Sequence, residues 1–256
     1  MSAREHITAA QPISTALADR GINRVRSKPQ SQLERQKRAA ARRAVDEVTD
    51  GMVVGLGTGS TAFFALEAIA ERIAAGLHVL GVPTSERTAA LANRLGIPLT
   101  TFASHRTIDL TIDGADEVDP RTLGLIKGRG GALLREKIVA AQSVRMIVIV
   151  DESKLVGRLG ARRLLPVEIV SFGWQTVVDR LAQRGLAPRM RIVDGEPFVT
   201  DGANYIVDCV IRELPDPASF NAGIKAIPGI VETGLFLGLA SRIIVGCPTG
   251  VEVIDA

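Results

Sequence analysis

A glycine-rich segment at residues 126–137 contains the side chains best suited to chemistry. Its glycines precede an expected helix, so unpaired backbone N–H groups and the positive end of the helix dipole favour an anion there. Lys127 adds a positive charge at the start of the loop, and Glu136 supplies a carboxylate about one turn into the helix. This combination predicts proton transfer on a bound phosphorylated small molecule. The alternative is an ordinary turn into a helix, with Glu136 in solvent.

A second glycine loop, at residues 57–62, lies between an expected strand and an expected helix. Its spacing fits the dinucleotide fingerprint, which also needs an acidic residue about 20 positions later to hold a ribose. The stretch around residues 80–84 has no acidic residue, and no Walker lysine follows the loop. We therefore expect neither a nicotinamide cofactor nor a nucleoside triphosphate. The hydroxyls of Ser60 and Thr61, beside free N–H groups, favour a small phosphate or a polyol.

Asp113 and Asp116 follow an expected strand at residues 107–112, on either side of Gly114. In open α/β sheets ligands bind at the carboxyl ends of the strands. Carboxylates in this position can hold sugar hydroxyls and relay protons between them. A calcium-binding loop or a simple capping loop is the alternative, although the spacing of an EF-hand loop is missing.

The composition is that of a folded chain with a small net charge. It has 256 residues, of which 46% are hydrophobic, and a formal net charge of +3. Residues 1–30 hold five basic and two acidic residues, so the rest is neutral overall and binding to nucleic acid is not expected. No apolar run approaches the roughly 20 residues of a membrane span, and the N-terminus lacks a secretion signal, which predicts a cytoplasmic protein. The histidines and cysteines lack metal-ligand spacing, so we expect neither a metal site nor a disulfide.

Strands and helices alternate along most of the chain, which predicts a parallel sheet covered by helices. Ser31 and Glu34 match a capping box at the start of the first helix. The expected strands are residues 52–56, 78–82, 97–101, 107–112, 146–150, 167–170, 189–193, 205–210, 231–236, 241–245 and 251–254. Because several of these strands end beside the two glycine loops, the acidic residues and the loops should share one edge of the sheet.

The order of elements divides the chain into domains. Residues 165–236 follow the order β-α-β-β-α-β, which is that of a ferredoxin-like α+β unit. We expect this unit to be inserted into a Rossmann-like main α/β domain made of residues 31–164 and 237–256. Residues 1–30 have no sustained apolar period and are expected to form a flexible extension, with organelle targeting as the alternative.

Four segments together resemble, in order and spacing, ribose-5-phosphate isomerase of type A: residues 55–62, 113–117, 127–137 and 151–154. The resemblance covers residues 31 to 256. It implies the two-part fold, a homodimer or homotetramer, and interconversion of ribose 5-phosphate and ribulose 5-phosphate in the non-oxidative pentose phosphate pathway. It also implies that the reaction requires neither a metal nor a cofactor.

The resemblance implies a role for each matching residue. Glu136 would be the general base that moves a proton between C2 and C1 of the open-chain sugar through a cis-enediolate, whose charge Lys127 would stabilise. Asp113 and Asp116 would hold hydroxyls and help to open the furanose ring. The other expected substrate-binding residues are Lys37, Thr58, Gly59, Ser60, Thr61, Gly114, Ala115, Gly128, Arg129, Gly130 and Lys154.

Arg129 departs from the family pattern, because many members have glycine there. A positive φ at this position would cost a residue with a side chain about 1 kcal/mol. Since loop amides rather than the side chain are expected to bind, activity should survive.

Three other functions are compatible with parts of the pattern. An amino-sugar phosphate deaminase would need a histidine-assisted ring-opening site, and a coenzyme A transferase would use its glutamate as a nucleophile. Neither explains Asp113 and Asp116 beside Lys127 as well as an isomerase does. A non-catalytic sugar-phosphate sensor would usually carry a DNA-binding helix pair, which residues 1–30 do not show.

Overall fold

The structure, a computed structural model, describes residues 31–212, 214 and 216–256, so the expected extension over residues 1–30 lies outside the described residues. The described helices are α1 (Gln32–Val45), α2 (Ser60–Ala74), α3 (Glu86–Arg94), α4 (Leu133–Ala141), η1 (Glu152–Lys154, a 3-10 helix), α5 (Trp174–Gln183) and α6 (Pro217–Lys225). The described strands are β1 (Val53–Leu56), β2 (Leu80–Pro83), β3 (Ile108–Asp113), β4 (Glu117–Asp119), β5 (Gly124–Ile126), β6 (Ser143–Asp151), β7 (Leu165–Ile169), β8 (Arg189–Met190), β9 (Ile192–Val193), β10 (Glu196–Pro197), β11 (Tyr205–Cys209), β12 (Ile230–Thr233), β13 (Leu235–Phe236), β14 (Arg242–Cys247) and β15 (Gly250–Asp255).

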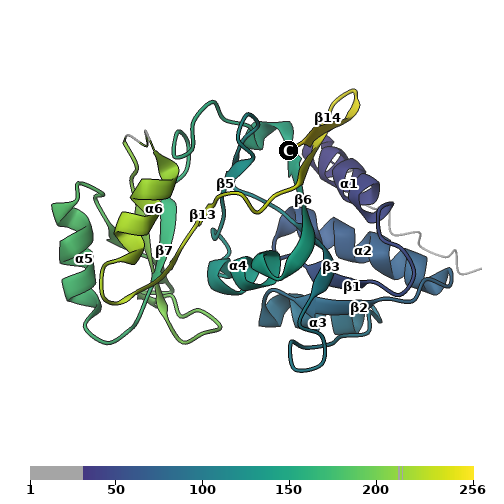
Figure 1. The fold of residues 1–256 in the computed structure, drawn as a ribbon, viewed down its shortest axis with the longest axis horizontal. Helices are drawn as coiled ribbons and strands as arrows, with labels where there is room; N and C mark the ends of the chain where they lie inside the picture. The colour runs from purple at the N-terminus through teal and green to yellow at the C-terminus, as the bar shows by residue number, and fades with distance from the viewer. Residues whose placement is uncertain (1–30, 213, 215) are drawn as a thin grey trace, which may run out of the picture. The chain divides into compact units, whose positions relative to one another are not determined.

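The largest sheet has six strands in the order β15-β14-β6-β3-β1-β2 (Figure 1). Neighbouring strands are parallel except at the edge, where β15 pairs antiparallel with β14. Alternate residues of β6 face two different cores: Ile147 and Ile149 pack with α1 and α2, whereas Met146 and Val148 pack with α4. A strand segment covered on both faces must be apolar, which explains the uninterrupted hydrophobic run over residues 146–150 within β6.

The first helix begins as the sequence predicts. Ser31 Oγ accepts the Glu34 N–H at 3.2 Å, and the Glu34 carboxylate accepts the Ser31 N–H at 3.1 Å, so the capping box is confirmed. Ala40 and Ala41 are fully buried, and their small side chains let α1 lie close to the sheet. A Cβ on Gly246 of β14 would lie 2.0 Å from the Gln36 carbonyl oxygen, so the helix passes the strand at a point where only glycine fits.

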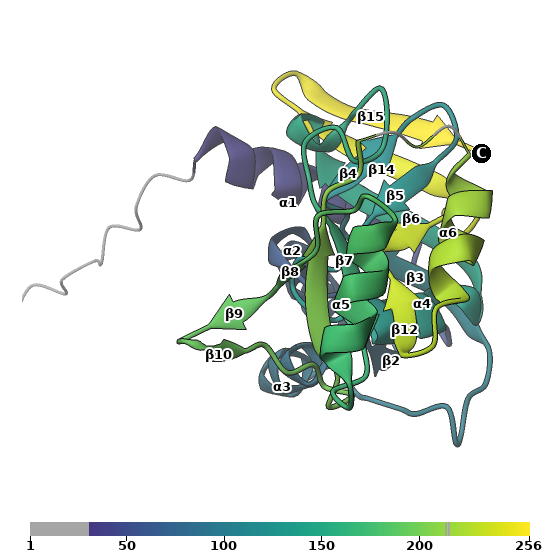
Figure 2. The same cartoon turned by 90° about the vertical axis from the view of Figure 1, so that its left-hand side faces the viewer.

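A second, antiparallel sheet has the strand order β12-β7-β11-β8 and packs against α5 and α6. Its chain order is β-α-β-β-α-β, which is the ferredoxin-like arrangement. Figures 1 and 2 show this unit beside the six-stranded sheet, with the β9–β10 hairpin projecting from it. The predicted α/β class, with a mainly parallel sheet covered by helices, is confirmed. The domain limits at residues 31–164, 165–236 and 237–256 stay a prediction.

The expected strand at residues 97–101 is absent. Leu99 makes only an isolated bridge to Gly81. Pro98 lacks an N–H group and contributes only its carbonyl, which accepts the Gly81 N–H. This stretch therefore borders the sheet without extending it.

Two other expected strands are each broken by one residue. The strand expected at 189–193 divides into β8 and β9 at Arg191, and β9 leaves the second sheet to pair with β10. The strand expected at 231–236 divides at Gly234, where a Cβ would lie 2.3 Å from the Lys127 carbonyl oxygen. This close approach sends β13 into a third sheet with β5 and β4, two strands that were not expected.

Among the residues that the structure describes, no helix has both the length and the apolar character needed to cross a bilayer.

Candidate active site

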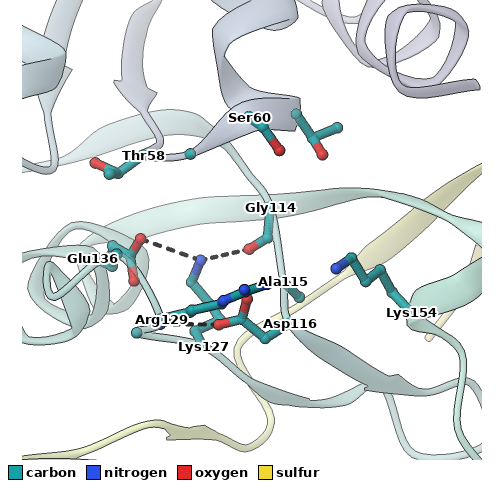
Figure 3. Close-up of a pocket in the computed structure, with 13 residues that line it drawn as sticks. Thr58, Ser60, Gly114, Ala115, Asp116, Lys127, Arg129, Glu136 and Lys154 are labelled. Atoms are coloured by element: carbon teal, nitrogen blue, oxygen red, sulfur yellow. Dashed lines mark hydrogen bonds and ion pairs between the residues drawn. The ribbon is translucent and has the colours of Figure 1, made fainter. Parts of the chain in front are cut away.

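A cavity of about 240 Å³ opens at the ends of β1 and β3, where α2 and α4 begin (Figure 3). Asp113 and Lys37 are predicted site residues that lie outside its lining. The 13 residues that line it are all predicted site residues: Thr58, Gly59, Ser60, Thr61, Gly114, Ala115, Asp116, Lys127, Gly128, Arg129, Gly130, Glu136 and Lys154.

Lys127 is a buried cation in the wall of this cavity, with a side chain that is only 2% exposed. Its Nζ lies 2.9 Å from Asp113 Oδ2 and 3.5 Å from Glu136 Oε1, and it donates to the Gly114 carbonyl. Burial by itself lowers the pKa of Lys127, but the charges of Asp113 and Glu136 outweigh burial and hold the pKa above its usual value. Lys127 is therefore a fixed positive charge in a site with little water.

Asp113 holds Lys127 from beneath the cavity. Its Oδ1 accepts the N–H groups of Thr58 at 3.0 Å and Gly114 at 2.7 Å, while Oδ2 faces Lys127. A Cβ on Gly57 would lie 2.3 Å from the same carboxylate, so only glycine fits beside it. Burial raises the pKa of Asp113, and Lys127 opposes the shift. The expectation that Asp113 holds a sugar hydroxyl stays a prediction; the carboxylate is fully buried outside the cavity lining, and its Oδ2 is ion-paired with Lys127.

Glu136 lies in the first turn of α4 and is 4% exposed. One oxygen faces Lys127, and the other, Oε2, is buried without a hydrogen-bond partner in the described part of the chain. Burial raises the pKa of Glu136 to about 8, and the nearby Asp113 and Asp116 add to the rise while Lys127 opposes it. Glu136 lines the cavity, and a buried carboxylate in a cavity wall can take a proton from a bound molecule.

Asp116 and Arg129 lie side by side in the cavity wall, where Asp116 Oδ2 accepts the Arg129 N–H at 3.0 Å (Figure 3). The strain considered at Arg129 does not arise, because the positive φ angles of this loop fall at Gly128 (100°) and Gly131 (79°). One of the three loop amides expected to face an anion is therefore occupied by Asp116. The Gly130 N–H has no hydrogen-bond partner among the described residues.

The first glycine loop opens α2 without a side-chain cap. Gly59 precedes the helix with φ of 123°, a conformation that favours glycine, and no side chain accepts the first N–H groups of the helix. These donors lie beside Ser60 and Thr61 in the cavity wall. Lys37 of α1 donates to Ser60 Oγ at 2.9 Å, which brings a cation to the rim of the cavity.

Thr58 lines the cavity, but its hydroxyl is held in a cluster of buried hydroxyls. Its Oγ1 lies within 2.7 to 2.9 Å of three other buried hydroxyl oxygens, those of Thr84, Ser85 and Thr88. A hydrogen bond from the Thr58 hydroxyl to a phosphate would require the hydroxyl to leave this cluster, and the role of Thr58 in substrate binding stays a prediction.

Lys154 lies on the side of the cavity opposite Glu136 (Figure 3). It ends η1, whose first turn is capped by the Asp151 carboxylate accepting the Ser153 N–H at 3.1 Å. Burial lowers the pKa of Lys154, and the charge of Asp151 opposes the shift. The cavity thus has two chemically different ends, one with Lys154 and the hydroxyls and one with Lys127 and Glu136.

The sequence analysis missed two residues that support the second glycine loop. Arg191 Nη1 donates to the carbonyls of Gly128 at 3.0 Å and Arg129 at 3.1 Å. A Cβ on Gly131 would lie 2.3 Å from the Phe198 ring, which therefore packs directly on the loop. No spacing in the sequence marks these contacts, because they depend on where the chain leaves the second sheet.

Comparison with known proteins gives consistent matches over nearly the whole described chain. The family model for ribose 5-phosphate isomerase A (phosphoriboisomerase A) matches residues 80–250. The sequence is 56% identical to ribose-5-phosphate isomerase A of Gloeobacter violaceus over 218 residues, which are 85% of this chain and 95% of that protein. The fold matches ribose 5-phosphate isomerase A from Methanocaldococcus jannaschii with a TM-score of 0.83 and 39% identity, over 86% of this chain and 98% of that one. It also matches a D-ribose-5-phosphate isomerase in complex with phospho-erythronic acid, with a TM-score of 0.84 and 36% identity over 88% and 99% of the two chains.

Proposed function

Because the chain belongs to the ribose 5-phosphate isomerase A family, we propose that it interconverts D-ribose 5-phosphate and D-ribulose 5-phosphate. The observation that carries this proposal is the buried Glu136 carboxylate in the cavity wall, 3.5 Å from the Lys127 ammonium. An aldose–ketose isomerisation needs a base, a stabiliser for a developing oxyanion and an anchor for the phosphate. The cavity offers all three.

The phosphate binds at the end of the cavity that holds the first glycine loop. There it accepts hydrogen bonds from the free N–H groups at the start of α2 and from the hydroxyls of Ser60 and Thr61. Lys154 and Lys37 supply positive charge on either side of this loop. The sugar then extends toward Glu136, on the opposite side of the cavity (Figure 3).

Glu136 acts as the general base on the open-chain sugar. Its carboxylate takes the proton from C2, the C2–H electrons form a C1–C2 double bond, and the C1 carbonyl oxygen becomes the oxyanion of a cis-enediolate. The hydroxyl proton of O2 passes to O1, C1 takes the proton back from Glu136, and C2 becomes the carbonyl of ribulose 5-phosphate. One carboxylate thus moves one proton between adjacent carbons, and no electrons leave the sugar.

Lys127 and the Gly130 N–H stabilise the oxyanion. Both groups line the cavity, and each donor of this kind is typically worth about 3 kcal/mol in the transition state. Asp113 acts through Lys127, because it contacts that ammonium and two loop amides instead of the cavity. Asp116 is the carboxylate left to hold a hydroxyl of the sugar and to assist opening of the furanose ring.

The raised pKa of Glu136 suits this role. A base whose pKa lies near the operating pH combines a useful deprotonated fraction with a strong tendency to take the proton. A carboxylate in water, with a pKa near 4.3, would be a much weaker base.

Turnover by the purified protein is the direct test. We expect ribose 5-phosphate to be converted to ribulose 5-phosphate without added metal, with a rate that EDTA leaves unchanged. In D₂O, NMR should detect deuterium at C1 of the ketose product, because an enediolate exchanges its proton with solvent through the base. Absence of turnover would refute the proposed function. Turnover with no deuterium at C1 under any sampling time would instead contradict the enediolate route.

Assembly as a homodimer or homotetramer and a cytoplasmic location stay predictions. Sedimentation of the purified protein would distinguish the two assemblies.

A further inference from the structure

Arg191 stands at the residue where the chain leaves the second sheet, between β8 and β9. Its backbone is fixed on both sides: its N–H donates to the Ile206 carbonyl at 2.9 Å, and its carbonyl accepts the Phe198 N–H at 2.8 Å. Its guanidinium forms a two-point pair with Asp208, at 2.9 Å from Nε and 2.5 Å from Nη2. A planar guanidinium held in this way has one remaining edge, with a fixed direction.

That remaining edge points at the second glycine loop. Arg191 Nη1 donates to the carbonyls of Gly128 and Arg129, at 3.0 and 3.1 Å. No peptide bond in the described part of the chain is cis, so within each peptide unit the N–H points away from its carbonyl. The two N–H groups that follow these carbonyls, those of Arg129 and Gly130, are therefore turned away from Arg191.

The hydrogen bond of the Arg129 N–H shows that this group points toward the cavity. The Arg129 N–H donates to Asp116, a residue of the cavity wall. The Gly130 N–H follows the next carbonyl held by the same guanidinium, and Gly130 also lines the cavity. One side chain on the far side of the loop thus sets the orientation of two peptide units that face the substrate.

We propose that Arg191, held by Asp208, is a positioning residue that keeps the Gly130 N–H aimed at the oxyanion of the reaction; this rests on the function proposed above. Without it the Arg129 carbonyl is free to turn toward the cavity. A carbonyl oxygen in that place would repel the enediolate, whereas the N–H stabilises it. Phe198 packs on Gly131 from the same side and limits the movement of the loop as a whole, but it does not select between the two orientations of the peptide.

Replacing Arg191 tests the proposal through the division of the effect between kcat and KM. In Arg191→Met, kcat should fall about 10- to 100-fold, because the Gly130 N–H is then no longer held in line with the oxyanion. KM should change by less than about threefold, because the phosphate is anchored at the other loop. Asp208→Asn, which frees the guanidinium without removing it, should show a smaller loss of kcat in the same direction.

The matched control is Arg189→Met. Arg189 lies two residues earlier on β8, is exposed, and has no hydrogen bond or ion pair from its side chain in the described chain. Arg189→Met removes one positive charge close to Arg191, as Arg191→Met does, so kcat of this control should stay within about twofold of wild type. Melting temperatures of all three variants measure how much of each effect comes from lost stability.

A binding measurement separates this inference from the proposed function. Phospho-erythronic acid carries a carboxylate near the position of the enediolate oxygens, whereas inorganic phosphate occupies the anchor alone. Calorimetry of folded Arg191→Met should show weaker binding of phospho-erythronic acid, by the same factor as the loss of kcat/KM, and unchanged binding of phosphate. Equal kcat and equal phospho-erythronic acid binding in wild type and Arg191→Met would overturn the inference, as would an equal loss for both ligands. If wild type fails to turn over, the proposed function fails, yet the two binding constants still decide the role of Arg191.

Discussion

The two glycine loops share an architecture but differ in the side chains around them. Each follows a strand and opens a helix without a side-chain cap, the first before α2 and the second before α4. Hydroxyls and the partly exposed Lys37 and Lys154 surround the first loop. Beside the second loop lie Lys127, Asp113 and Glu136, none of which is more than 4% exposed.

This difference separates binding from chemistry. Exposed cations and helix N–H groups attract a phosphate equally in the ground state and in the transition state, so they favour binding without favouring reaction. A buried lysine and glutamate are desolvated, and their interactions strengthen as charge develops on the sugar. Changes at the first loop should therefore raise KM, and changes at the second should lower kcat.

Removing the base should have the largest effect. Glu136→Gln keeps the size of the side chain but cannot take a proton, so kcat should fall by about 10²- to 10⁴-fold while KM stays within about threefold. Steady-state kinetics in both directions of the reaction measure this. Glu71→Gln makes the same chemical change on the exposed surface of α2 and should leave kcat unaltered. A Glu136→Gln enzyme with nearly wild-type kcat would locate the base elsewhere.

Removing the buried cation should have the next largest effect. In Lys127→Met, kcat should fall by about 10²- to 10³-fold, as for loss of one oxyanion donor. The same change leaves Asp113 and Glu136 buried without their partner, so unfolding in urea should show a loss of about 3 kcal/mol or more.

A double variant separates these two roles of Lys127. Adding Asp113→Asn to Lys127→Met removes one of the two unpaired carboxylates and should recover part of the stability, but none of the activity. Recovery of kcat in the double variant would contradict the assignment of Lys127 to the oxyanion.

The pH dependence of kcat/KM should test the role of Glu136 beside the second glycine loop. Because burial raises the pKa of Glu136 to about 8, kcat/KM should rise about tenfold per pH unit below pH 8 and level off above it. Glu136→Gln should lose this limb together with most of its activity. A profile that stays flat between pH 6 and pH 8, roughly the range in which the carboxylate should titrate, would show that the group that titrates is not the base.

The stability of the fold should change in the opposite direction over the same range. The pKa of Glu136 in the folded state lies above its value of 4.5 in the unfolded chain, so the folded state binds this proton more tightly. Its contribution to the free energy of unfolding is fully present below about pH 4.5 and is lost as the pH rises through 8. Urea unfolding of wild type and of Glu136→Gln across this range measures both free energies of unfolding. The wild-type value should fall relative to that of Glu136→Gln as the pH becomes alkaline.

The sequence predicted the members of the cavity well because its signals are local. A glycine loop that opens a helix, and acidic residues at a strand end, occupy adjacent positions in the chain, and the parallel sheet brings such ends to one edge. Every residue of the cavity lining was among the expected site residues, although several, such as Lys154 and Ala115, were expected only from the family resemblance. Local signals could not tell that Asp113 is enclosed under Lys127, because its burial depends on the close approach of Gly57 on the neighbouring strand segment.

Contacts that join distant segments were not predictable. The segment over residues 189–193 contains no glycine or proline, and nothing in it marks Arg191 as the point where the chain turns from one sheet into the β9–β10 hairpin. Gly234 divides the stretch over residues 231–236, because a Cβ at this position would lie 2.3 Å from the Lys127 carbonyl oxygen. The break at Gly234 and the contact of the Arg191 side chain with Gly128 both involve partners more than 60 residues away, which single-sequence patterns do not encode.

The smallest expected effect tests the binding side of the comparison. In Lys154→Met, KM for ribose 5-phosphate should rise about tenfold, which is the value of one charged hydrogen bond at a partly exposed site, and kcat should stay within about twofold. The inhibition constant for inorganic phosphate should weaken by the same factor, because phosphate uses this end of the cavity alone. Lys225→Met, which removes a lysine paired with Glu232 in the second sheet, should alter neither constant. If Lys154→Met instead lowered kcat at constant KM, charge at the first loop would act on the transition state. The division between a loop that binds and a loop that reacts would then fail, even with Glu136 confirmed as the base.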